Sequence, residues 1–168
     1  METEGNNADQ NQNKSMGGRI GYLPLSNLEI GFSVAKGETN IPGEANRNYE
    51  VADVDFAFQP SSIVELRGEY VKTKVGALTA SAIPDAHSWK AWYVQASHKF
   101  APGKWESVVR YGKFNPPESA DDQKQATVGT NYLFAANVVA KIAYEFNQAK
   151  PGTAADENRV LLQLAYGF

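Results

Sequence analysis

The last ten residues, Arg159-Val160-Leu161-Leu162-Gln163-Leu164-Ala165-Tyr166-Gly167-Phe168, decide the fold class. A large apolar side chain stands at every second position of this stretch, and the final position is aromatic. The apolar set is Val160, Leu162, Leu164, Tyr166 and Phe168. This alternation is typical of a β-strand that has one apolar face and one polar face.

The same alternation recurs upstream in about nine segments of roughly ten residues, beginning near Ser15. The apolar runs are far shorter than the roughly 20 residues that a membrane-spanning helix needs, so a membrane crossing would have to use strands. The chain has no cysteine, which excludes disulfides and thiolate metal sites. Its net charge of -3 provides no basic field for nucleic acid.

The connections between these segments alternate between short and long. Short ones are expected at 24–27, 59–62, 101–103 and 135–136, and long polar ones at 37–48, 74–87, 115–123 and 148–157. Strict alternation predicts an all-β fold, an antiparallel transmembrane β-barrel with short periplasmic turns and long external loops. We expect residues 15–168 to form the strands and residues 1–14 to be the remnant of an external loop.

Complete bacterial barrels have an even number of strands, so nine strands predict part of a larger barrel. The alternative is that the second to ninth strands close as an eight-stranded barrel.

The polar faces are predicted to line a water-filled lumen, because they mix small residues with charges of both signs. The expected lining residues are Arg19, Arg67, Arg110, Lys141, Arg159, Glu65, Glu69, Glu106, Glu145, Asp53 and Asp55, with Glu29 and Lys99 beside them. Aromatic residues lie near both ends of the apolar faces, as membrane interfaces favour. These are Tyr22, Phe58, Tyr70, Trp92, Phe100, Trp105, Phe134, Tyr144 and Phe146.

Tight turns also predict which charges face one another. A turn at Pro60-Ser61 would place Asp55 opposite Arg67, and a turn at Pro102-Gly103 would place Lys99 opposite Glu106. Such pairs can simply hold the wall together. Arg110, Lys141 and Arg159 lie towards the middle of separate strands and are the expected contacts for permeating anions.

Two sets of residues resemble known families. Leu162 to Phe168 (Leu-Gln-Leu-Ala-Tyr-Gly-Phe) resembles the C-terminal signal by which the barrel assembly machinery recognises outer-membrane porins. Tyr93-Val94-Gln95-Ala96-Ser97 and Trp105-Glu106-Ser107-Val108-Val109-Arg110-Tyr111 resemble the phosphate-selective porin O and P family. The resemblance implies a sixteen-stranded, trimeric pore for anions, in contact with lipid in the outer membrane of a Gram-negative bacterium.

The sequence therefore predicts a porin, or a fragment of one, that forms a passive diffusion channel for small hydrophilic solutes or anions, with phosphate as a candidate. No catalytic residue, metal site or cofactor is expected, and the chain is not expected to be an enzyme. Two alternatives stay open: a small non-conducting barrel with a structural or adhesive role, and a soluble ligand-binding β-barrel.

Overall fold

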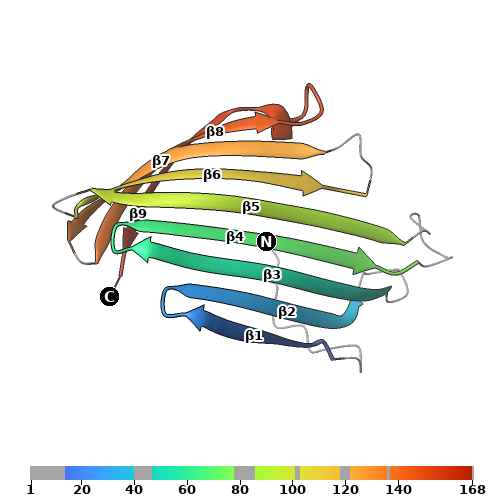
Figure 1. Ribbon diagram of the computed structural model, residues 1–168. Helices are drawn as coiled ribbons and strands as arrows, with labels where there is room; N and C mark the ends of the chain where they lie inside the picture. Colours follow the sequence, from blue (N-terminus) through green and yellow to red (C-terminus); the bar gives the residue numbers. More distant parts are fainter. Residues whose placement is uncertain are drawn as a thin grey trace, which may run out of the picture.

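The computed structural model describes residues 14–39, 47–77, 86–100, 103–117, 122–135 and 137–167. These residues form one antiparallel sheet in which nine strands follow one another in sequence order (Figure 1). The strands are β1 (Met16–Leu25), β2 (Leu28–Thr39), β3 (Arg47–Ser61), β4 (Val64–Val75), β5 (His87–Phe100), β6 (Trp105–Asn115), β7 (Gln123–Ala135), β8 (Val138–Gln148) and β9 (Arg159–Tyr166). A short 3-10 helix, η2 (Ala154–Asp156), precedes β9.

Short and long connections alternate as predicted. We call the strand ends joined by short connections the turn end, and those joined by long connections the loop end; they lie on the left and right of Figure 1. One short turn differs from the prediction. β3 continues through Pro60 and Ser61, and the turn falls at Ser62 and Ile63, after an irregularity in the pairing of β3 with β4.

The sheet is strongly curved, and β9 passes behind the front strands, so Figure 1 shows the convex face. Among the described strands, β1 pairs with β2 alone and β9 with β8 alone. The sheet is therefore open. The expected alternative, an eight-stranded barrel closed between β2 and β9, is not what the structure shows, because β2 is already paired on both sides.

The apolar face has no core to pack against. In the described part of the chain no hydrophobic residue is buried, and Phe56, Ile142 and Leu164 are 37%, 48% and 73% exposed. A soluble protein would not leave such a large apolar surface uncovered in water. The apolar side chains lie on the convex face, where a porin barrel meets lipid, and this arrangement argues against the soluble β-barrel.

Aromatic side chains gather near both ends of this convex face. At the turn end Trp105 packs against Tyr132 with ring centroids 4.5 Å apart, and Tyr132 packs against Phe134 at 4.7 Å. At the loop end Tyr144 and Phe146 are in contact at 4.6 Å. Of the predicted aromatic residues, Trp105 and Phe134 thus lie near the turn end, and Tyr144 and Phe146 near the loop end. That they mark membrane interfaces stays a prediction.

Tyr132 was not among the predicted aromatic residues, and neither was Tyr111, which contacts Trp92. Phe168 lies outside the described residues. Within those residues, no helix has the length and apolarity needed to cross a membrane.

Candidate functional site

The candidate site is the concave face, which we call the inner wall. Directly opposite residues of neighbouring strands point to the same side of a sheet, so the register shows which side chains share this face. All the predicted lining residues do: Arg19, Arg67, Arg110, Lys141, Arg159, Glu65, Glu69, Glu106, Glu145, Asp53 and Asp55. Whether they line an open pore stays a prediction.

A row of polar residues crosses six neighbouring strands of the inner wall, β4 to β9. Each member lies directly opposite the next: Arg67, Gln95, Arg110, Thr127, Glu145 and Arg159. We call this set the arginine row. It places three guanidinium groups along one line of the wall, with one carboxylate among them.

The three arginines have different partners. Arg67 forms an ion pair with Glu65 of its own strand. Arg159 donates a hydrogen bond from Nη2 to the carbonyl oxygen of Ala154, 2.7 Å away, which ties the arginine to η2. Arg110 lies over the ring of Tyr93, 3.8 Å from its centroid. A cation-π contact leaves hydrogen-bond donors of the guanidinium available, so Arg110 is the best placed of the three to meet an anion.

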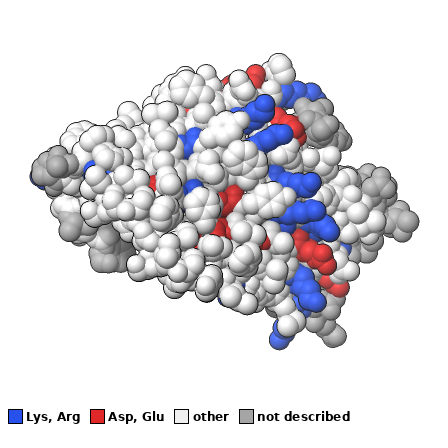
Figure 2. All heavy atoms as spheres, in the orientation of Figure 1, with Lys and Arg blue, Asp and Glu red and all other residues white. Residues whose placement is uncertain are grey.

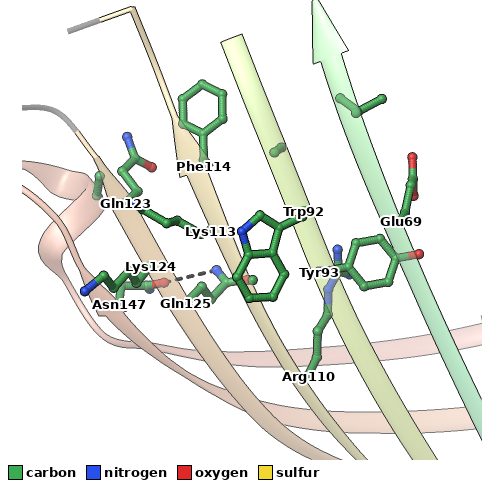
Figure 3. Close-up of a pocket in the computed structure, with 14 residues that line it drawn as sticks. Glu69, Trp92, Tyr93, Arg110, Lys113, Phe114, Gln123, Lys124, Gln125 and Asn147 are labelled. Atoms are coloured by element: carbon green, nitrogen blue, oxygen red, sulfur yellow. Dashed lines mark hydrogen bonds between the residues drawn. The ribbon is translucent and has the colours of Figure 1, made fainter. Parts of the chain in front are cut away.

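A hollow of about 350 Å³ lies beside Arg110 (Figure 3). Glu69 and Tyr93 border it from β4 and β5, and Gln125 and Asn147 from β7 and β8. Gln125 donates a hydrogen bond to the side-chain oxygen of Asn147, 3.0 Å away. Lys113 and Lys124 also line the hollow, which is thus bordered by three cationic residues, one carboxylate and three side-chain amides. Such a set can replace part of the hydration shell of a small solute.

Near the other edge of the sheet, at β1, Arg19 of the inner wall bridges three strands. Its Nη2 lies 2.9 Å from Glu29 Oε1 on β2 and 2.8 Å from Asp55 Oδ1 on β3. The guanidinium passes over Gly31 of β2, where a β-carbon would collide with both the Asp55 carboxylate and Arg19. The absence of a side chain at Gly31 therefore makes room for the ion pair.

The predicted pairing of Asp55 with Arg67 is wrong. Asp55 lies opposite Glu69, and Arg67 lies opposite Ala57. The cause is the β3–β4 turn, which falls two residues later than expected and moves the register of the whole hairpin. Asp55 finds its cation on β1 instead, at Arg19.

The second predicted pairing is confirmed as a register. Lys99 lies directly opposite Glu106. The Glu106 carboxylate also accepts a hydrogen bond from Asn131 Nδ2, 2.7 Å away, on the next strand. Lys141 lies directly opposite Asn131, which extends this polar cluster to β8.

The Gly31→Val substitution is expected to displace the Arg19–Asp55 pair and loosen β1. The pair is partly solvated, so the cost should be about 0.5 to 1 kcal/mol. Hydrogen exchange of the backbone amides of β1 measures it: exchange should quicken in β1 and not in β8. Gly18→Val is the control, because a β-carbon at Gly18 meets nothing within 4 Å. Equal exchange in β1 of both variants would contradict the role of the bridge.

At the loop end, Lys113 Nζ lies 2.8 Å from Asp122 Oδ2, just before β7 begins. Hydrogen bonds from Lys113 and Asn115 hold the pKa of the Asp122 carboxyl below its usual value. A lowered carboxyl pKa means that the pair stabilises the fold above the usual pKa. That contribution is lost as the pH falls through the folded-state pKa.

In the Lys113→Met variant the pKa of Asp122 is expected to rise towards its ordinary value, because the largest cause of the shift is gone. Carboxyl-carbon chemical shifts followed over acid titration measure it. Lys90→Met removes a lysine that does not contribute to the shift and should leave the titration unchanged. An unaltered pKa in Lys113→Met would refute the pairing.

Several inner-wall residues were missed at the level of sequence. Tyr93, Gln125 and Asn131 hold charged or polar partners, yet they were not among the predicted lining residues, all of which are charged. Their position in the two-residue repeat would have placed them on this face. His87, expected in a loop, is the first residue of β5.

The model of one protein family, phosphate-selective porin O and P, matches residues 4–168. The chain belongs to this family. Members are non-enzymatic channels of the bacterial outer membrane and are typically oligomeric, which places this porin chain in that membrane.

A solved structure of a porin, refined at 1.8 Å, has the same fold. The TM-score is 0.67 at 15% sequence identity, over 92% of this chain and 51% of that one. The porin chain therefore spans about half the length of the solved porin that it matches. A comparison with curated proteins gives no match.

Proposed function

We propose that the inner wall is one side of a water-filled diffusion channel for small hydrophilic solutes, with anions preferred at the arginine row. One observation carries the proposal: the same nine strands that leave every described large apolar side chain unburied hold all the predicted lining charges on the concave face. Lipid on one side and water on the other accounts for both faces at once.

Support for an anion preference comes from Arg110. Its guanidinium rests on Tyr93 beside the hollow, whereas Arg19 and Arg67 are held in ion pairs with carboxylates. Phosphate is a fitting solute for such a group, because guanidinium can bind its oxygens in pairs. The family's name points to the same substrate, and Lys141 and Arg159 would be further contacts along the wall.

Conductance in planar bilayers tests the proposal. The refolded chain is added to a phosphatidylcholine membrane in potassium chloride, and discrete current steps are expected. Reversal potentials in a salt gradient should then show more chloride than potassium passing. A membrane that stays tight while the protein inserts would favour the alternative, a non-conducting structural barrel.

We further propose that the long connections face the cell exterior and that the protein assembles as a homotrimer. The alternation of short turns with long loops supports the orientation. The family's typically oligomeric members support the assembly. The exposed edge strand β9, with Val160, Leu162, Leu164 and Tyr166 on its apolar side, fits the predicted signal for the assembly machinery.

A further inference from the structure

The convex face carries a second charged feature that a channel does not require. Figure 2 shows a band of basic side chains near the loop end of this face, on the right, running across the strands with some acidic side chains among them. The register assigns six lysines of β2, β4, β5, β6 and β7 to the apolar side of the sheet. We call this set the lysine belt: Lys36, Lys72, Lys74, Lys90, Lys113 and Lys124.

Four of these lysines face one another directly. Lys72 lies opposite Lys90, and Lys113 lies opposite Lys124. Like charges directly opposite in a sheet repel and destabilise the pairing of the strands. Two such pairs on adjoining hairpins are therefore costly unless an anion lies between the ammonium groups.

Acidic residues of the described chain neutralise the belt only in part. Asp122 forms an ion pair with Lys113. Glu50 lies between Lys36 and Lys74 in the register, while Lys72 and Lys90 have each other as direct neighbours. An excess of positive charge remains on the face that meets lipid.

A hollow of about 580 Å³ adjoins the belt over β1 to β4. Small or apolar residues, Gly18, Val34 and Ala52, line one part of it, and Lys36 and Lys72 line another. Lys74 and Glu50 line it too, so the hollow combines an apolar surface, suited to an acyl chain, with three ammonium groups suited to phosphate and one carboxylate. Aromatic side chains adjoin the belt on the same face: Tyr70 lies two positions before Lys72 on β4, and Trp92 lies opposite Lys113.

We propose that the lysine belt binds a glycolipid whose headgroup carries two phosphates, of the lipid A type, with an acyl chain in the hollow over β1 to β4. Lys72 and Lys90, with no carboxylate directly opposite either of them, would hold one phosphate, and Lys113 and Lys124, which Asp122 neutralises only in part, would hold the other. A zwitterionic headgroup has no net negative charge to offset the remaining repulsion. The glycolipid is favoured over other lipids because the belt lies at the loop end, which the proposed orientation directs outwards. The inference rests on that orientation, and it does not depend on conduction.

Lipid binding to the full chain, refolded in neutral detergent, tests the inference by native mass spectrometry. The probes are lipid A, cardiolipin and phosphatidylcholine. The belt variant is Lys72→Gln with Lys90→Gln. The matched control, Lys99→Gln with Lys104→Gln, loses the same charge at the turn end.

Lipid A is expected to bind most tightly, and the belt variant should lose at least about tenfold in affinity, since each lysine near an anionic lipid contributes about fivefold. The control should bind as the original chain does. Equal binding by both variants, or tighter binding of cardiolipin, would overturn the inference. A belt variant that keeps its lipid but changes its oligomeric state would identify a second copy of the chain as the occupant instead.

Conductance of the same variants separates this inference from the proposed function. A chain that binds lipid A through the belt but passes no current would leave the inference standing and remove the channel. A chain that conducts but binds the three lipids equally would leave the channel standing and remove the lipid inference.

Discussion

The Val128→Arg substitution is expected to destabilise the membrane-inserted fold by about 2 to 4 kcal/mol. Val128 lies in the middle of β7, opposite Val109 and Tyr144, and is 53% exposed on the apolar face. If that face meets lipid, arginine there places a charge near the middle of the bilayer. Denaturant titration of the chain folded into phosphatidylcholine vesicles, followed by tryptophan fluorescence, gives the free energy of unfolding.

The neighbouring residue provides the matched control. Thr127 points to the inner wall and lies directly opposite Arg110 on one side and Glu145 on the other. Thr127→Arg introduces the same side chain one position away, into water and between one guanidinium and one carboxylate whose effects oppose each other, so its cost should be about 0.5 kcal/mol or less. Two variants of equal stability, or a less stable Thr127→Arg, would mean that the two faces have been assigned the wrong way round.

The Arg110→Glu substitution is expected to reverse the ion preference of the channel. Exchanging a guanidinium for a carboxylate at this wall position changes the energy of a passing anion by about 1 kcal/mol, or about fivefold in the permeability ratio. The measurement is the reversal potential of a planar bilayer in a potassium chloride gradient, before and after the exchange.

Arg110→Lys distinguishes charge from shape. It keeps the positive charge but replaces the planar group that rests on Tyr93. Chloride preference should survive in this variant. If Arg110→Glu and the original chain give the same reversal potential, Arg110 does not contact the permeating ions, and the arginine row has no part in selectivity.

Much of the fold could be predicted from the sequence because strand geometry is local. Successive side chains of a strand point to opposite faces, so the two-residue repeat places Arg110 on one side and Val109 on the other without knowledge of any partner. The order of strands was predictable for the same reason, since short turns force neighbours in sequence to pair.

The lysine belt shows where that approach was incomplete. The repeat already places Lys72 and Lys90 on the apolar face, yet attention to the polar face left them unnoticed. Their approach to one another is a different matter. It depends on the register between β4 and β5, which the two-residue repeat of either strand alone does not specify.

The sequence by itself determined that this protein is a sheet of alternating strands, which residues belong to each face, and that the faces meet different surroundings. Only the tertiary structure decided which charges are partners: Asp55 with Arg19 across Gly31, Arg110 with Tyr93, and Lys72 beside Lys90. The physical reason is that the face on which a side chain lies depends only on the two-residue repeat within its own strand. Which residues of two neighbouring strands lie opposite one another depends on the register, and a turn displaced by two residues changes every such pair along a hairpin.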